Sequence, residues 1–265
     1  MTEKMTLAAL HEVLRGLALP QILFFEETDS TNTQALNLAN EQPGEFSLMI
    51  AERQSAGRGR MGRSWVTTPG TSLAFSLILK PDPEEIAKLG LFSLLGGLAV
   101  CRAIEVLCNI QAQVKWPNDV LLDGLKTAGV LAETSWQGER LNGLVLGIGI
   151  NVLHGSAPPK EEVIFPATCV AAHSPIPVER LEFLAAVLEQ VIILRAGILQ
   201  PAFLQEYNQR LAYLGEAVAL SSRMGEEVTG KVAGVAEDGC LLLEVPGGSL
   251  QRFPIGDLHL RPQSS

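Results

Sequence analysis

Residues 57–65 form a segment rich in glycine and arginine, and the runs on both sides of it have the pattern of β-strands. Residues 46–51 are apolar, and residues 72–80 alternate well enough for a strand. Gly57 to Gly62 match G-x-G-x-x-G, the dinucleotide fingerprint, which requires a helix to open from the glycines. Here Pro69-Gly70 leads into another strand instead. We therefore predict a strand-loop-strand unit rather than a Rossmann site.

The composition of this loop suits an anionic ligand. Its three glycines allow tight turns and close approach of the backbone to a ligand. Its three arginines carry planar, permanently charged guanidinium groups that match phosphate or carboxylate. These residues are Gly57, Arg58, Gly59, Arg60, Gly62 and Arg63.

Length and composition describe a globular protein. The 265 residues, with 47% hydrophobic and 18% charged side chains, can form one large domain or one large and one small domain. The net charge of −9 argues against nonspecific binding to nucleic acid or to an acidic membrane. The apolar run Leu89–Val100 is shorter than the ~20 residues that span a bilayer, so we expect a buried helix. Without a secretory signal pattern or CxxC spacing, we expect a cytoplasmic protein with buried thiols.

Residues 7–39 predict a helix, a strand and a second helix. Leu7–Leu17 has helical spacing but lacks the companion helices of a DNA-binding helix-turn-helix. Ile22–Phe25 follows as a short strand, and Thr33–Ala39 as a helix. Thr28 to Asn32 offers several N-capping side chains between them. Taken alone, this cluster is most simply a helix cap.

Residues 81–152 place polar side chains at breaks between short strands. Pro81-Asp82-Pro83 ends the preceding strand, and Glu84–Leu107 predicts one long apolar helix. Val114–Leu122 predicts two short strands around a proline, and Asp123-Gly124 is a hairpin signal that returns residues 125–135 beside them. Residues 141–152 predict a further strand. Pairing of these strands is expected to bring four residues toward one cleft: Lys115, Asp119, Lys126 and Asn151.

The last third of the chain predicts a change of architecture. Residues 155–177 are expected to form a crossing loop, and Leu181–Leu194 and Pro201–Leu211 two helices. Short strands then predict a small antiparallel barrel or sandwich, with a boundary near Leu214-Gly215 that separates domains 1–214 and 215–265. The strands are Val218–Ser221, Glu227–Val235, Cys240–Val245 and Leu250–Pro254, and the turns between them are Met224-Gly225, Asp238-Gly239 and Gly247-Gly248.

Five segments, in this order, resemble the motifs of the biotin protein ligase family, also called biotin–[acetyl-CoA-carboxylase] ligases. They are Thr28–Asn32, Gly57–Trp65, Lys115–Asp119, Lys126–Leu131 and Gly147–Asn151. The resemblance is strongest over residues 25–151. It implies an α+β fold in which helices flank a central mixed or antiparallel sheet, as in class II synthetases, followed by a small SH3-like β-barrel. We expect the monofunctional type, which lacks an N-terminal DNA-binding domain.

The same resemblance implies a two-step reaction. Biotin and MgATP would form biotinyl-5′-AMP, and a lysine of a biotin carboxyl carrier protein would then take the biotin. ATP with Mg²⁺ and biotin would be substrates, without a tightly bound prosthetic group. DNA and membranes are not expected partners, and the protein would be a monomer or a homodimer.

Roles for individual residues also follow from the resemblance. Arg60 and Lys126 would be catalytic, because they would hold the biotin carboxylate against the α-phosphate. Trp65 would stack on adenine, and Asp119 would bind Mg²⁺. The biotin site would comprise Ser30, Thr31, Gln54, Gly57, Arg58, Arg60 and Lys126. The ATP and AMP site would comprise Arg60, Arg63, Trp65, Asn118, Lys126 and Asn151.

Several alternatives stay open. Trp116 is expected in the core, Asp123 in the turn, and Lys115 is either a solvated lysine or a second contact to phosphate or carboxylate. For the whole chain, the alternative is a lipoate ligase or octanoyltransferase that acts on a lipoyl carrier domain. The arginine loop with Gln54 favours biotin. A further alternative is a non-catalytic sensor of biotin or nucleotide, which would keep the pocket and lose the chemistry. The presence of Arg60, Lys126 and Asp119 counts against it.

Overall fold

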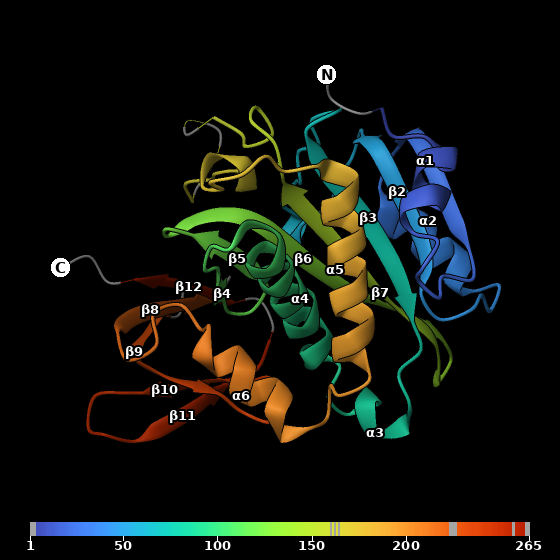
Figure 1. Ribbon diagram of the computed structural model, residues 1–265. Coiled ribbons are helices and arrows are strands. Elements are labelled where there is room, and N and C mark those ends of the chain that lie inside the picture. The colour runs from blue at the N-terminus through green and yellow to red at the C-terminus, as the bar shows by residue number, and fades with distance from the viewer. Residues whose placement is uncertain are drawn as a thin grey trace.

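The computed structural model describes residues 4–159, 161, 163, 165–222, 227–255 and 258–262. Its main layer is a seven-stranded sheet of order β1-β2-β3-β7-β6-β5-β4, in which β1 and β2 run parallel and the other neighbours antiparallel (Figure 1). Its strands are Ile22–Thr28 (β1), Ser47–Gln54 (β2), Ser72–Leu79 (β3), Gln113–Lys115 (β4), Asp119–Leu122 (β5), Leu125–Gln137 (β6) and Arg140–Asn151 (β7). The expected α+β fold with a central mixed sheet is confirmed.

Helices cover both faces of this sheet. Phe75 of β3 belongs to the large apolar core, with α4 (Gly90–Cys108) and α5 (Arg180–Arg195). Its near neighbour Ile78 points to the other face and packs in a smaller core with α2 (Thr31–Ala39). Successive side chains of a strand point to opposite faces, so a strand covered on both sides is apolar throughout, as β3 largely is. Figure 1 shows α4 and α5 lying across the same face of the sheet.

Helix α4 is long and apolar enough to cross a membrane by length and composition, yet 78% of its apolar window is buried inside the protein. Burial of a Leu, Val or Phe side chain stabilises a fold by roughly 1.5–3 kcal/mol. Cys101 and Cys108 lie on this helix as free thiols, and burial raises the pKa of each. The predicted buried helix is therefore confirmed as a core element.

Strand β7 has one aliphatic face and one glycine-rich face. The aliphatic side chains point into the large core and are Leu144, Leu146, Ile148 and Ile150. The alternating positions on the opposite face include Gly147 and Gly149. A Cβ atom at Gly147 would lie 1.9 Å from Asn32 Oδ1, at the start of α2. Glycine in this strand therefore permits close approach of neighbouring segments.

The prediction of one long helix over residues 84–107 is wrong, because two helices occupy this segment. Helix α3 (Pro83–Ile86) begins with a capping box, in which the Asp82 carboxylate accepts hydrogen bonds from the N–H groups of Glu84 and Glu85. Helix α4 begins only at Gly90, after residues 87–89.

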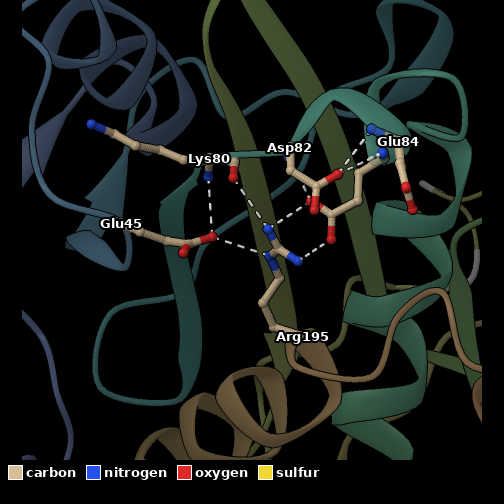
Figure 2. Close-up of polar contacts among 6 residues, drawn as sticks. Glu45, Lys80, Asp82, Glu84 and Arg195 are labelled. Carbon is tan, nitrogen blue, oxygen red and sulfur yellow. Dashed lines mark hydrogen bonds and ion pairs between the residues drawn. The ribbon is translucent and has the colours of Figure 1, made fainter.

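Arg195, in the last turn of α5, ties that helix to α3 and to the sheet (Figure 2). Its guanidinium donates hydrogen bonds to the carboxylates of Glu45 and Glu85 and to the carbonyl of Lys80. The side chain of Glu85 is only 4% exposed. The buried charges of this cluster therefore have partners of opposite charge within the protein.

The C-terminal strands form a separate five-stranded antiparallel sheet of order β11-β10-β9-β8-β12. Its strands are Ala217–Ser222 (β8), Glu227–Val235 (β9), Leu241–Glu244 (β10), Leu250–Phe253 (β11) and Leu258–Pro262 (β12). The predicted small β domain is confirmed, although β12 was not expected. The predicted turn Met224-Gly225 lies outside the described residues, and the boundary near residue 215 stays a prediction.

Two further helices differ slightly from expectation. Helix α1 (Leu7–Val13) ends before Leu17, where Gly16 gives poor support to a helix. Helix α6 (Pro201–Gln209) leads toward the C-terminal sheet. That sheet contacts the main one through Trp116, whose Nε1 donates to the Gly239 carbonyl at 3.0 Å.

Candidate functional site

The loop of residues 57–65 folds back on itself over the glycine-rich face of the sheet. The N–H of Gly59 donates to the Arg63 carbonyl at 2.7 Å, and the N–H of Trp65 to the Gly57 carbonyl at 2.9 Å. A Cβ atom at Gly57 would lie 2.3 Å from the Trp65 carbonyl oxygen, so this position requires glycine. Arg60–Gly62 form one 3₁₀ turn, and the next element is β3. The strand-loop-strand prediction is confirmed.

The loop, the sheet and the start of α2 enclose a cavity of about 140 Å³. All five segments that the sequence singled out contribute to its lining. Among the described residues that line it, five carry positive charge and one is acidic: Arg58, Arg60, Arg63, Lys115, Lys126 and Asp119. This excess of cationic groups suits a ligand with several negative charges.

Lys126 reaches the cavity because β6 contains a β-bulge. Asp119 pairs with Gly129 and Leu121 with Lys126, so Thr127 is an extra residue in β6. Residues opposite each other in an antiparallel pair share a face, and the bulge therefore puts Lys126 on the face of Asp119. Lys126 Nζ lies 2.5 Å from Asp119 Oδ1. The expected proximity of these two residues is confirmed.

The N-terminus of α2 is capped by Gln54 instead of the predicted serine and threonine side chains. Ser30 is the N-cap residue, but its hydroxyl makes no capping hydrogen bond. The N–H of Thr31 donates to Gln54 Oε1 at 2.8 Å, and the Thr31 hydroxyl lies 3.1 Å from the same oxygen. Gln54 ends β2, so the sheet itself supplies the cap. Ser30, Thr31 and Gln54 all line the cavity.

Asp29 fixes the backbone that leads into this helix. Its carboxylate accepts hydrogen bonds from Gln34 Nε2 at 2.9 Å and from the Ser30 N–H at 2.6 Å. The hydrogen bond from Gln34, followed by that from Ser30, lowers the pKa of Asp29 below its ordinary value. A negative charge is thereby favoured beside the positive end of α2.

The indole of Trp65 packs on two glycines of the sheet. A Cβ atom at Gly149 would lie 2.2 Å from Trp65 Cε2, and one at Gly129, its partner across β6 and β7, would lie 3.1 Å from Cζ3. Lys126 Nζ lies 5.7 Å from the centroid of the ring. Trp65 thus lines the cavity from a position that larger residues at 129 and 149 would block.

Three residues that the sequence analysis did not assign to the site form a polar network beside it. Asn32 is 4% exposed, its Nδ2 donates to the Glu133 carboxylate at 2.8 Å, and its Oδ1 accepts from the Ser76 hydroxyl at 2.6 Å. Arg58 Nη2 donates to the same Glu133 oxygen at 2.6 Å. Ser76 interrupts an otherwise apolar stretch of β3, and this was the available signal, whereas Glu133 lies in a β6 that contains several polar residues.

The other predicted residues divide between two places. Arg60 Nη1 donates to Asn118 Oδ1 at 3.1 Å, and both residues line the cavity, as Arg63 does. Gly57 instead lines a second cavity next to the loop. Asn151 is not among the described lining residues of either cavity, and its Nδ2 donates to the Thr168 carbonyl at 3.1 Å. The expectation that Asn151 shares the cleft with Lys126 is not met.

The open alternatives are resolved by burial. Lys115 is 8% exposed, lines the cavity and lies 3.8 Å from the ring centroid of Phe165, so it is not a solvated lysine. Trp116 is buried in the core, as expected, and also lines the cavity. Asp123 occupies the turn with a positive φ of 48°, and its carboxylate lies 2.8 Å from His173 Nδ1.

Among the described residues that line the cavity, one carboxylate could contribute to the binding of a metal ion. In the described part of the chain, groups of three or more His, Cys, Asp or Glu side chains that could hold a metal ion are absent. Asp119 supplies one carboxylate to the cavity. Mg²⁺ is often held in this way, by one or two carboxylates together with substrate phosphates and water.

Two protein-family models and several known proteins match this chain. The model of the biotin/lipoate A/B protein ligase family matches residues 24–151, and that of the biotin protein ligase C-terminal domain matches residues 213–261. The biotin–[acetyl-CoA-carboxylase] ligase of Paracoccus denitrificans is 34% identical, over 83% of this chain and 93% of that protein. The bifunctional ligase/repressor BirA of Bacillus spizizenii is 31% identical, over 90% of this chain and 74% of that protein.

A solved structure aligns along nearly the whole chain. The biotin protein ligase of Aquifex aeolicus in complex with biotin and ATP has a TM-score of 0.78 and 31% identity, covering 92% of this chain and 99% of the other.

Proposed function

The chain belongs to the biotin protein ligase family, and from this premise we propose that its cavity binds biotin and ATP together and that Arg60 and Lys126 catalyse their reaction. The chain is an ATP-dependent biotin ligase rather than a lipoate ligase, because the relatives and the aligned structure are named for biotin. The observation that carries the site proposal is the lining of five cationic side chains with one carboxylate. Biotin carboxylate and the ATP phosphates are the anions that this reaction must bring together.

The biotin ring would lie toward the start of α2. Its ureido group is neutral and offers both hydrogen-bond donors and an acceptor, which suits hydroxyl and amide partners. Ser30, Thr31 and Gln54 line that end of the cavity, and Gln54 is held in place by Thr31. Backbone around Gly57 and the Arg58 side chain would close over the ring. These contacts bind biotin but take no part in bond making.

In the first step, a biotin carboxylate oxygen attacks the α-phosphorus of ATP. An O–P bond forms to give biotinyl-5′-AMP, while the P–O bond to the β-phosphate breaks and diphosphate leaves with its electron pair. Arg60 and Lys126 would hold the two anions against each other and neutralise charge on the α-phosphate in the transition state. Asp119, 2.5 Å from Lys126 Nζ, would orient the lysine.

The nucleotide would lie toward Trp65. Its indole would stack on adenine with the face turned away from Gly149, and Arg63 would contact phosphates. Asn118, which accepts a hydrogen bond from Arg60, would keep that arginine aligned with the nucleotide. Asp119 would contribute an oxygen to the Mg²⁺ that ATP carries. Asn151 stays a predicted ATP contact that would need a shift of its amide.

In the second step, a neutral lysine amine of a carrier protein attacks the acyl carbon of biotinyl-5′-AMP. The C–N bond forms, the bond to AMP breaks, and the amine loses a proton. A biotin carboxyl carrier domain is the proposed macromolecular partner, and the scheme involves neither DNA, nor a membrane, nor a prosthetic group. A homodimer and a cytoplasmic location remain predictions.

The division into a catalytic unit of residues 1–214 and a C-terminal β unit of residues 215–265 is also a proposal. Leu260 of β12 lines the cavity, and Gly239 accepts a hydrogen bond from Trp116. The β unit would therefore help to shape the nucleotide side of the site. Its deletion should impair turnover, and unchanged turnover would refute that role.

The test is carrier labelling with defined components. The protein is incubated with ATP, Mg²⁺, isotopically labelled biotin and an apo biotin carboxyl carrier domain, and the intact mass of the carrier is measured. We expect one biotin per carrier, and none on a carrier whose target lysine is replaced by arginine. Lipoate in place of biotin is the parallel reaction. Labelling by lipoate alone, or no labelling, would refute the proposed function.

A further inference from the structure

The loop of residues 57–65 forms a wall that is shared by two cavities. The loop residues that line both the site cavity and a second cavity of about 680 Å³ are Arg58, Gly59, Arg60, Met61, Arg63 and Ser64. The second cavity is also lined by Glu133.

One carboxylate pins this wall. Glu133 Oε2 accepts a hydrogen bond from Arg58 Nη2, in the loop, at 2.6 Å and from Asn32 Nδ2, in α2, at 2.8 Å. The side chains of Arg58 and Glu133 are 40% and 27% exposed, so the pair is partly shielded from solvent. A hydrogen bond between two ionised groups is stronger than a neutral one. A single oxygen of β6 thus joins three elements.

A chain of hydrogen bonds leads from Asn32 to the residues that are proposed to contact biotin. Asn32 Oδ1 accepts from the Ser76 hydroxyl, which also lies 2.8 Å from the Thr31 hydroxyl. Thr31 in turn contacts Gln54. Because Ser76 is fully buried, these hydrogen bonds have no water to replace them. Displacement of Asn32 would therefore disturb Thr31.

We propose that Glu133 is a positioning residue, which holds the loop closed through Arg58 and the start of α2 in place through Asn32. This inference rests on the proposed function for its consequence. With the wall closed, biotin is retained and water is kept from the mixed anhydride. With Glu133 neutralised, the wall opens more often, biotin binds more weakly, and biotinyl-5′-AMP escapes before the carrier takes it.

The test begins with a measurement that needs no ligand. Hydrogen exchange is followed at the amides of Gly59 and Trp65, whose hydrogen bonds lie within the loop. Glu133→Gln keeps the size of the side chain and removes its charge, and should speed exchange at both amides by about tenfold. The control is Glu27→Gln, which neutralises the exposed pair of Glu27 with Arg53 on the neighbouring strands. Unchanged exchange in Glu133→Gln would overturn the inference whatever the protein catalyses.

Activity then tests the consequence. For Glu133→Gln we expect a KM for biotin about tenfold higher, a nearly unchanged kcat for diphosphate release at saturation, and an excess of diphosphate formed over carrier labelled. In an Arg58→Met background, Glu133→Gln should raise the KM for biotin little further, because Glu133 has already lost its partner Arg58. Full additivity, or equal diphosphate and carrier labelling, would overturn the positioning role. Absence of labelling by the unmodified protein would instead refute the proposed function.

Discussion

Two clusters of charged side chains that contain arginine, one around Arg195 and one around the cavity, differ in charge balance. Around Arg195, one guanidinium meets the carboxylates of Glu45 and Glu85 and a backbone carbonyl (Figure 2). Around the cavity, five cationic side chains share one lining carboxylate, that of Asp119. In the first cluster two carboxylates outnumber one guanidinium, so the cation has anionic partners within the fold, whereas the second cluster has positive charge in excess.

The difference distinguishes structural charge from functional charge. Repulsion among like charges at the cavity costs stability, and a bound anion relieves it. At Arg195, the same residue type joins α5 to α3 and has no exposed anion site to offer. The balance of charges around an arginine is therefore a better guide to its role than the residue type alone. The following changes test this contrast.

Lys126→Ala is expected to produce the largest effect, on rate. The variant should lose about 10²–10³-fold in adenylation kcat, because a positioned charge at the α-phosphate disappears. Biotin affinity should fall much less, and the free energy of unfolding should hardly change. Diphosphate release and calorimetry measure the two quantities. Comparable losses in rate and in affinity would reveal a binding residue instead of a catalytic one.

Arg195→Met should do the reverse and destabilise the fold. It leaves the buried carboxylate of Glu85 without its cationic partner, which costs about 3 kcal/mol in the free energy of unfolding. Urea denaturation measures this change, and KM values of the folded fraction should be unaltered. Glu84→Gln, on the exposed side of α3, is the control and should change stability by less than ~0.5 kcal/mol. A stable Arg195→Met protein with impaired catalysis would contradict the contrast.

Trp65→Ala sharpens the assignment within the cavity. Loss of a stacking surface should raise KM for ATP about tenfold, since base stacking on an aromatic ring contributes about 1–3 kcal/mol. Trp65→Phe should recover most of this loss, and KM for biotin should change little. Steady-state kinetics with each substrate varied in turn makes the distinction. An equal rise in both KM values would mean that Trp65 shapes the whole cavity.

The smallest effect is expected at Glu206, a carboxylate that forms ion pairs with Arg102 and Arg210. The hydrogen bond from Arg102 is the main cause that holds the pKa of Glu206 below its ordinary value of 4.5, and Arg210 contributes. A depressed pKa gives stability that is present above the ordinary value and lost as pH falls through the folded value. Glu206→Gln should therefore flatten the loss of stability below pH 4.5. Urea midpoints across this range measure it, and an unchanged slope would be evidence against the assignment.

Sequence patterns predicted most of the fold because hydrophobic periodicity follows directly from burial. The strands around the loop, the hairpin at Asp123-Gly124 and the core helix α4 all have local signals. The break between α3 and α4 was missed, since apolar residues continue across it. Strand β12 was missed because its pairing with β8 is a contact distant in sequence.

The site was predicted less completely, because its geometry depends on contacts between distant segments. Gln54 as the cap of α2 could not be read from local sequence, which offered Ser30 and Thr31 as better caps. Glu133 and Asn32 meet across 101 positions of the chain. Asn151 belongs to a matching motif, yet its amide bonds to the Thr168 carbonyl, a contact that strand pattern alone does not reveal.

The bulge at Thr127 determines which changes of sequence and length the β5–β6 hairpin can tolerate. Substitutions in the β5–β6 hairpin leave the parity of the strand intact, so Lys126 still faces Asp119. Removal of Thr127 would give a regular ladder in which Leu121 still pairs with Lys126, so the lysine would keep its face and the strand would lose only the bend of the bulge. The hairpin is therefore expected to tolerate substitutions, and even loss of this one residue, as long as Leu121 still pairs with Lys126.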